Sequence, residues 1–434
     1  MMTSTRTLSL ARFLAVLLIA IVALRVAWVS DDALITLRTA LNITHNWGPG
    51  FNATESVQAY THPMWFLLWV WIGAWTNQWI LGVLALSLVL VIVATTLLFK
   101  QARSVGRILI AVALLLLSNA FIDFTTSGLE NPLAYATVAV LVTLSLRDRG
   151  DSPASPGWAI WLGLTAAAVV LTRMDLLVLI AIPLALVAWN HRRDVRTLAI
   201  GLGAFLVPLI VWFTWTFVTY SALLPNTFAA KTNAEIPRVE FIVQGFRYLW
   251  VSFENDPITL IALSLGVGVG MIAGPRLLRG WALGVVAYLG YVVWIGADFM
   301  GGRFLALPVF VAMFIFAASP LRVGNGTPTS QADAEDPTIA PLAAATATVA
   351  LLLIGVSAAG IQTTALQNPQ SPRWEVDQNF NAGVADARGL SVADGDSLKS
   401  MIDALSLAYV DPDFAPIGDG TGLGRPLRNL DKSA

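Results

Sequence analysis

Long apolar runs separated by short polar segments make up most of the chain. Runs of about 20 apolar residues can cross the hydrocarbon core of a bilayer as helices. Eleven segments of spanning or near-spanning length are expected, at about residues 8–29, 78–99, 108–124, 130–146, 158–172, 176–190, 197–219, 257–273, 281–296, 304–319 and 339–361. The pattern therefore predicts an all-α polytopic membrane protein, a bundle of about eleven transmembrane helices.

A further apolar piece, from Pro63 to Trp75, has 13 residues and begins with proline. It is too short for a full span, so we expect an interfacial or re-entrant helix. With this choice the basic connections all fall on one face, namely Lys100, Arg103, Arg107, Arg147, Arg149, residues 191–196, Arg276, Arg279 and Arg322. Because basic loops mark the cytoplasmic side, the N-terminus is predicted to be cytoplasmic and the C-terminus external.

Composition narrows the class of protein further. A chain with 56% hydrophobic and 12% charged residues is not an ordinary water-soluble globule. Its net charge of −1 offers no field to attract nucleic acid, and the absence of cysteine excludes disulfides and thiolate chemistry. Two arginines, Arg6 and Arg12, precede a first run with no small-residue cleavage signal, which predicts an uncleaved first helix.

Two adjacent carboxylates, Asp31 and Asp32, follow the first apolar run within the sequence Ser30-Asp31-Asp32-Ala33. Ionised carboxylates near lipid are costly to maintain, so an acidic pair at the mouth of a span is a functional-site hypothesis. The other unusual polar clusters are expected on the same outer face. We therefore predict that this pair is a catalytic centre.

Other charged residues are expected below the membrane surface. Only 33 residues, from Trp158 to Asn190, hold two helices, whereas a full hairpin needs about 40 plus a turn. Arg173 and Asp175 must then lie in protein or in a water-filled cavity, and the same geometry applies to Asp298 and Arg303. Lys231, on an outer loop, is either solvated or part of the site.

The polar C-terminal part is expected to be separate from the membrane part. Residues 321–338 have the composition of a flexible cytoplasmic linker. We predict a transmembrane catalytic domain over residues 1–361 and an external, periplasmic segment over 362–434, interpreted as a truncated accessory domain. The glycine run at 418–424 follows no strand and opens no helix, so it lacks the context of a nucleotide-binding fingerprint.

Seven short motifs recur in order on the expected outer face. They are Ser-Asp-Asp-Ala-Leu-Ile-Thr-Leu-Arg at 30–38, Gly-Pro-Gly-Phe-Asn at 48–52, Gln-Ala-Tyr-Thr-His-Pro-Met-Trp at 58–65, Thr-Ser-Gly-Leu-Glu-Asn-Pro-Leu at 126–133, Leu-Thr-Arg-Met-Asp at 171–175, Leu-Pro-Asn-Thr-Phe-Ala-Ala-Lys at 224–231 and Gly-Ala-Asp-Phe-Met-Gly-Gly-Arg-Phe at 296–304. This series resembles that of actinobacterial GT-C glycosyltransferases, in particular the terminal arabinofuranosyltransferases that use decaprenyl-phosphate arabinose. The resemblance covers residues 8–361.

The resemblance implies a GT-C helical bundle in the bacterial cytoplasmic membrane, with its active site on the external face. One carboxylate of the Asp31 and Asp32 pair would be the general base for an acceptor hydroxyl. The donor phosphate would be bound by Lys231, Arg303 and Arg173. Sugar and acceptor contacts are assigned to Tyr60, His62, Glu130, Asn226 and Asp298. Two roles are equally open for Glu130, Asp175 and Asp298. They are either partners that hold the site cations or plain internal salt bridges.

The expected partners are a decaprenyl-phosphate-linked sugar, an arabinan or lipoglycan acceptor and the lipid bilayer, with no nucleic acid. No cofactor is expected, although a divalent cation beside Asp31 and Asp32 stays open. The alternative from another class is a transporter or channel for a polar solute. That alternative predicts charges through the whole membrane depth and an internal repeat, and neither is visible in the sequence.

Overall fold

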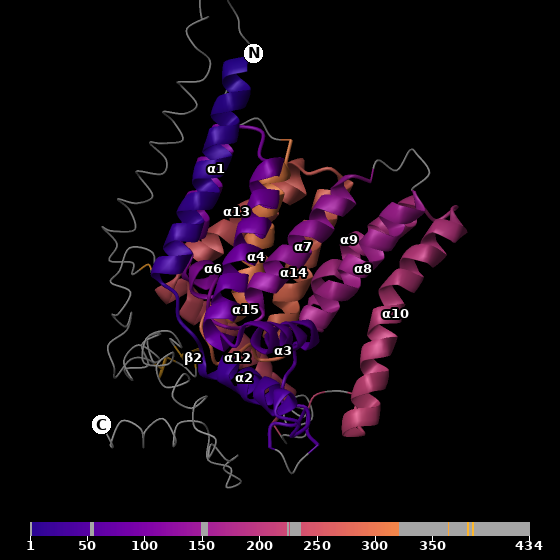
Figure 1. Cartoon of the computed structure of the whole chain (residues 1–434). Coiled ribbons are helices and arrows are strands. Elements are labelled where there is room, and N and C mark those ends of the chain that lie inside the picture. The colour runs from indigo at the N-terminus through magenta and orange to yellow at the C-terminus, as the bar shows by residue number, and fades with distance from the viewer. Residues whose placement is uncertain are drawn as a thin grey trace, which may run out of the picture.

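The computed structural model describes residues 2–52, 56–148, 155–223, 225, 236–320, 363, 380–381 and 384–385. This part of the chain forms a helical bundle (Figure 1). Its helices are α1 (Met2–Arg25), α2 (Asp31–Thr44), α3 (Pro63–Thr76), α4 (Trp79–Gln101), α5 (Val105–Leu117), α6 (Asn119–Asp123), α7 (Asn131–Leu146), α8 (Pro156–Thr172), α9 (Leu176–Asn190), α10 (Val195–Tyr220), α12 (Arg238–Asn255), α13 (Pro257–Ala273), α14 (Arg276–Trp294) and α15 (Arg303–Ala318). Two short strands, β1 (Phe380–Asn381) and β2 (Val384–Ala385), pair antiparallel.

Ten of the eleven expected apolar segments coincide with described helices, and the eleventh, at 339–361, lies outside the described residues. The segment expected at 108–124 is two helices, because Ser118 ends α5 and its hydroxyl caps the start of α6. By length and composition, four described helices are able to cross a membrane, or five when the bent pair α12–α13 counts as one span. The count of eleven spans therefore stays a prediction.

Helices α1 and α4 run antiparallel. The guanidinium of Arg12, in the first half of α1, donates to the carbonyl oxygens of Lys100 and Ala102 at the end of α4, at 3.2 and 2.8 Å. Residues 26–78 therefore begin and end at one end of the bundle, which we call the α2/α3 end (Figure 1). The placement of α3 there agrees with the expectation that Pro63 to Trp75 does not span.

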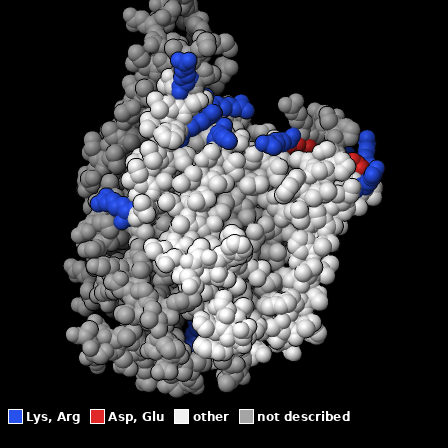
Figure 2. Space-filling model, in the orientation of Figure 1, with Lys and Arg blue, Asp and Glu red and all other residues white. Residues whose placement is uncertain are grey.

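Basic residues mark the opposite end of the bundle. Figure 2 shows most of the visible Lys and Arg side chains along the upper rim, away from the α2/α3 end. Lys100 lies in the last turn of α4 and Arg103 directly after it, residues 192–196 join α9 to α10, and Arg276 and Arg279 lie in the first turn of α14. The two ends of the molecule thus differ in charge as the sequence pattern predicted.

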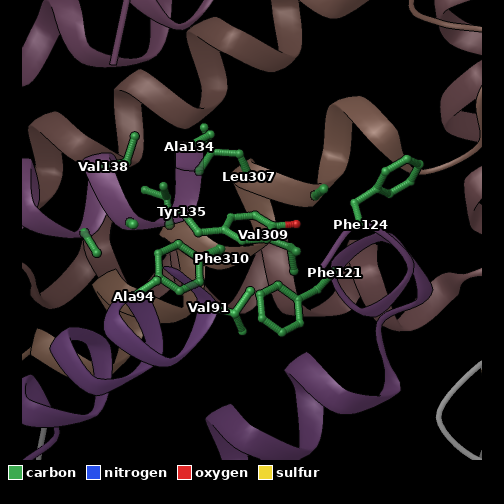
Figure 3. Packing of buried hydrophobic residues seen from close by; sticks show 14 of the residues in the cluster. Val91, Ala94, Phe121, Phe124, Ala134, Tyr135, Val138, Leu307, Val309 and Phe310 are labelled. Carbon is green, nitrogen blue, oxygen red and sulfur yellow. The ribbon is translucent and has the colours of Figure 1, made fainter. Parts of the chain in front are cut away.

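Between the two ends, the interior is apolar and contains aromatic side chains. Phe121 of α6, Tyr135 of α7 and Phe310 of α15 form a trio with ring centroids 5.2 to 6.2 Å apart (Figure 3). All three are fully buried. Close packing of this kind resists movement, so it holds in place the starts of α7 and α15, where Glu130 precedes α7 and Arg303 begins α15.

Candidate active site

The acidic pair lies in the first turn of α2. Ser30 caps the helix, since its hydroxyl accepts from the backbone N–H of Ala33 at 3.2 Å. The backbone N–H of Ser30 in turn donates to the carbonyl of Ser127 at 2.9 Å. A helix N-terminus favours negative charge, so the fold accommodates both carboxylates at this position.

The two aspartates have different surroundings. Asp31 is exposed, and one of its carboxylate oxygens accepts from the backbone N–H of Asp32 at 2.8 Å. The side chain of Asp32 is 31% exposed, and its Oδ2 lies 3.1 Å from Nη1 of Arg303. Burial raises the pKa of Asp32 and is the largest effect on it. The guanidinium of Arg303 lowers this pKa, whereas the neighbouring carboxylate of Asp31 raises it further. The sequence predicted only the effect of the neighbouring carboxylate.

A glycine positions Arg303 at the start of α15. Gly302 adopts a left-handed conformation, with φ of +80°, and a Cβ added there would lie 3.0 Å from the Cα of Ala120. Glycine adopts this conformation without steric cost, and it also lets the turn approach α6. The turn therefore directs Arg303 back towards α2.

Three carboxylates surround the guanidinium of Arg303. Its Nη1 lies 3.1 Å from Asp32 and 3.2 Å from Asp298, and its Nη2 lies 3.4 Å from Glu130. The side chain is 13% exposed. The Nε–H of Arg303 has no hydrogen-bond partner among the described residues. One cation thus joins three acidic groups and keeps an unused donor.

Glu130, directly before α7, is shared by three partners. Its Oε1 lies 3.4 Å from Arg303 and 3.7 Å from Arg173, and its Oε2 lies 3.5 Å from Nδ1 of His62. The side chain is 1% exposed. Burial alone favours the neutral acid, but Arg303, His62 and Arg173 together lower the pKa of Glu130 to about 2. Glu130 is therefore ionised at neutral pH and holds the two arginines together.

Arg173 occupies the short turn between α8 and α9. These helices have 17 and 15 residues, as the short hairpin predicted. The guanidinium makes a bidentate contact to Asp175, at 3.1 and 2.7 Å, and lies over the ring of Phe304 at 4.6 Å. The hydroxyl of Tyr288 donates to Asp175 at 2.7 Å and accepts from Arg173 at 3.1 Å. Arg173 is thereby fixed from several directions.

His62, immediately before α3, connects this group to α2. Its Nε2 lies 2.8 Å from the hydroxyl of Thr36, one helical turn beyond Asp32. Burial lowers the pKa of His62 to about 4, in spite of the opposing effect of Glu130. The imidazole is therefore neutral at pH 7. A tautomer with its proton on Nδ1, directed at Glu130, and with Nε2 accepting from Thr36 suits both contacts.

The charge cluster, as we call Asp32, His62, Glu130, Arg173, Asp175, Asp298 and Arg303, is rich in negative charge. Four carboxylates face two guanidinium groups, and the imidazole is neutral. A bound phosphate would add further negative charge. A further cation would offset this excess of negative charge, and Lys231 is the only lysine in the sequence between residues 101 and 398.

Three other predicted site residues lie elsewhere or outside the described part. Tyr60 is buried, its ring stacks on Phe66 with centroids 3.8 Å apart, and its hydroxyl lies 3.1 Å from that of Tyr220. These contacts attach the α2–α3 connection to α10, and a direct sugar contact by Tyr60 stays a prediction. Lys231 and Asn226 lie outside the described residues.

Sequence reasoning missed three residues that support the cluster. Thr36 orients His62, Tyr288 contacts both members of the Arg173 and Asp175 pair, and Tyr248 contacts the turn that leads to Arg303. Only Thr36 carried a usable signal, since a residue four positions after Asp32 lies on the same helical face. Tyr288 lies within the largely apolar α14, and Tyr248 lies on the buried face of the amphipathic α12. Nothing in the local sequence distinguishes either tyrosine from a core residue.

No group of three or more His, Asp or Glu side chains in the described part of the chain has the arrangement of a metal site. The arginines occupy the space between the carboxylates. The expectation that no cofactor is needed stays a prediction.

The chain is similar in sequence to two curated proteins. No protein-family model matches the chain. It is 29% identical over 356 residues to a terminal β-(1→2)-arabinofuranosyltransferase of Mycobacterium tuberculosis, covering 69% of this chain and 53% of that protein. It is 28% identical over 352 residues to a protein of the same name from Corynebacterium glutamicum, covering 68% and 48%. The chain spans about half the length of the curated relatives it matches.

The fold has a counterpart among solved structures. The chain is similar to the crystal structure of ArnT from Cupriavidus metallidurans bound to undecaprenyl phosphate, with a TM-score of 0.52 and 14% identity, over 92% of this chain and 71% of that one. The fold is therefore that of a GT-C glycosyltransferase. The resemblance to arabinofuranosyltransferases that the seven motifs indicated is confirmed.

Proposed function

We propose that this chain transfers an arabinofuranosyl unit from a polyprenyl-phosphate donor to an arabinan acceptor of the cell wall. The observation that carries the proposal is the convergence of Asp32, Arg303, Glu130 and Arg173 beside the exposed Asp31. This convergence occurs at one end of a bundle with the ArnT fold. The names of the two arabinofuranosyltransferases support the sugar and a β-(1→2) linkage.

In the proposed reaction, Asp31 is the general base. Its carboxylate is exposed, and among the described residues no cation contacts it. The acceptor hydroxyl oxygen forms a bond to the anomeric carbon while the bond from that carbon to the phosphate oxygen breaks. The hydroxyl proton passes to Asp31, and the polyprenyl phosphate departs with the bonding electron pair. Asp32 holds Arg303 and takes no proton from the acceptor.

The phosphate is assigned to Arg303, Arg173 and Lys231. Arg303 begins α15 at the α2/α3 end of the bundle, and its side chain is 13% exposed. Fixed cations stabilise the charge that develops on the leaving phosphate without reorganising during the reaction. The undecaprenyl phosphate bound to ArnT supports a lipid-phosphate ligand for this fold. The surplus of carboxylates supports the need for Lys231 as a third cation.

Contacts to the sugar and acceptor are assigned to His62 and Asn226. Tyr60, two residues before His62, attaches the α2–α3 connection to α10. Glu130 and Asp298 each contact Arg303, so we assign them the alternative left open by the sequence, as partners that position the cations. In this arrangement the acidic groups fix where the phosphate binds.

The α2/α3 end is proposed to face the outside of the bacterial cytoplasmic membrane. Support comes from the basic rim at the opposite end, which the positive-inside rule assigns to the cytoplasm (Figure 2). Since the chain has no cysteine, single cysteines at exposed Gln78 and Arg193 provide a test. An impermeant thiol reagent should label residue 78 and not residue 193 in intact cells. The reverse result would invert the proposed orientation.

The transporter alternative has no specific observation in its favour. The ion pairs of the described residues lie at the two ends, with the charge cluster at one and the Asp148 and His191 pair at the other. Between them lie the apolar layers that include Phe121, Tyr135 and Phe310 (Figure 3). A hydrophilic path through the bundle is therefore unsupported.

The proposal is tested by the choice of donor. Purified protein in nanodiscs is incubated with an oligoarabinofuranoside and radiolabelled decaprenyl-phosphate arabinose, and in parallel with the decaprenyl-phosphate mannose analogue as a matched control. We expect label in a lengthened oligosaccharide from the arabinose donor alone. Transfer from the mannose donor in preference would contradict the proposed sugar, and no transfer by folded protein would contradict the proposed activity.

A further inference from the structure

Helix α12 exposes an unbroken apolar stripe. Five large side chains at helical spacing are between 44% and 62% exposed, namely Val239, Val243, Phe246, Trp250 and Phe253. The intervals of four, three, four and three residues place them on one face. Exposed patches of this extent in a protein indicate a contact surface.

The rest of α12 divides into two further faces. Charged residues Glu240, Arg247 and Glu254 are exposed along one side of the stripe. On the other side, Gly245, Tyr248 and Ser252 are buried. A Cβ added at Gly245 would lie 2.4 Å from the carbonyl oxygen of Val293, so this face packs tightly on α14. The helix therefore has one protein-facing, one apolar and one charged side.

The direction of α12 differs sharply from that of the bundle. It is bent by 106° from α13, which follows after a break at Asp256. The carboxylate of Asp256 fixes the bend, because it accepts from the backbone N–H of Ala120 at 2.9 Å and from that of Thr259 at 3.3 Å. If α13 runs along the membrane normal, α12 lies close to the membrane plane.

We propose that α12 is an interfacial helix whose apolar stripe is embedded in the lipid at the outer surface of the bilayer. The neighbouring helices also expose apolar side chains, since Ile261 of α13 and Trp294 of α14 are 49% and 53% exposed. The guanidinium of Arg238 lies 5.1 Å from the ring centroid of Trp294, and the indole N–H of Trp250 donates to Glu254 at 2.7 Å. Aromatic rings with polar partners are typical of the boundary between lipid and water.

This helix also contacts the segment that positions Arg303. The buried hydroxyl of Tyr248 donates to the carbonyl of Met300 at 3.3 Å and accepts from the backbone N–H of Phe304 at 3.2 Å. The depth of α12 in the bilayer therefore sets the height of Arg303 relative to the lipid headgroups. The lipid contact itself does not rest on the proposed function, whereas its use in presenting a lipid-linked donor does.

Because the chain has no cysteine, spin labels can be attached singly. Labels at Phe246→Cys and Trp250→Cys are compared with labels at Glu240→Cys and Arg247→Cys as matched controls, all on exposed positions of the full chain in nanodiscs. Collision with oxygen reports lipid, and collision with a water-soluble nickel chelate reports water. We expect the ratio of oxygen collision rate to nickel collision rate to be higher at residues 246 and 250 than at residues 240 and 247. The ratios at 246 and 250 should be similar, because both labels would lie at similar depth in the lipid.

Two results would overturn the proposal. Nickel access at residues 246 and 250 equal to that at 247 would place the stripe in water. Protection of both from oxygen and nickel alike would show that protein covers the stripe, either the C-terminal segment or a second copy of the chain. Each variant's melting temperature is measured alongside, and the Val243→Cys label replaces any that fails to fold. Failure of transfer activity with a lipid-embedded stripe would affect the proposed function alone.

Discussion

Arg303 and Asp32 stand 271 positions apart in the chain, yet their side chains meet at 3.1 Å. This contact joins the start of α15 to the start of α2, the helix that carries both members of the acidic pair. It occupies Asp32 and leaves Asp31 exposed beside it. In the proposed reaction the two aspartates therefore have separate tasks, since Asp32 orients a cation and Asp31 accepts a proton.

Replacing Asp32 tests the orienting role. In Asp32→Asn, Arg303 keeps its contacts to Asp298 and Glu130, so the protein should fold. We expect transfer to fall mainly through weaker use of the donor, because the guanidinium is then free to move towards the other two acids. Donor titration at saturating acceptor measures this effect. A loss confined to the acceptor dependence would assign Asp32 to the acceptor instead.

The phosphate assignment predicts donor-specific defects. A charge-assisted contact to phosphate contributes roughly 1.5 to 3 kcal/mol, so Arg303→Ala or Lys231→Ala should weaken donor use by about 10- to 150-fold. Arg303→Lys should recover part of this loss, since a single ammonium cannot reproduce a planar fork. The same titration, with melting temperatures, separates phosphate binding from a purely structural role for Arg303. An unchanged donor curve in Arg303→Ala would refute the assignment.

Glu130 is expected to act through the residues it positions. Removing one partner of a buried ion pair costs roughly 3 to 5 kcal/mol, so Glu130→Gln should lower the melting temperature. It should also reduce transfer at saturating acceptor, because both arginines lose their shared partner. Asp148→Asn is the control, since the Asp148 side chain is also buried and lies 2.9 Å from His191 at the opposite end. Equal loss of transfer in both variants would mean that only stability matters.

Stability should depend on pH through His62. Burial lowers its pKa from 6.5 to about 4, so between these values the unfolded chain binds a proton that the folded protein does not. The free energy of unfolding therefore falls as the pH drops from about 6.5 towards 4. The pKa of Glu130, lowered from 4.5 to about 2, has its effect only below pH 4.5. Melting temperatures at pH 7.5 and 5 should fall more for the wild type than for His62→Gln, and equal falls would contradict this account.

The sequence predicted those parts of the site that local pattern determines. The apolar segments predicted ten of the described helices, and the motif series contains Asp32, Glu130, Arg173 and Arg303, which the structure brings together. The short α8–α9 hairpin also follows from a local rule of helix length.

Contacts between distant segments were beyond sequence reasoning. Tyr288 lies in the middle of an apolar helix, and only the packing of α14 on α9 brings it to Asp175. The pairing of Glu130 with both arginines likewise depends on how three loops meet. The sequence therefore left open whether Glu130 is a partner that holds the site cations or a plain internal salt bridge, since its contacts come from distant segments.

The central claim is that Asp31 is the base of a polyprenyl-phosphate-dependent transferase. The most direct test is the rate of arabinose transfer at saturating donor and acceptor for wild type, Asp31→Asn and Glu254→Gln, a charge-removing control on the exposed side of α12. Loss of a general base should reduce the rate by roughly 10²-fold or more in Asp31→Asn without changing its melting temperature. Glu254→Gln should transfer arabinose at the wild-type rate. Near-wild-type transfer by folded Asp31→Asn would contradict the account.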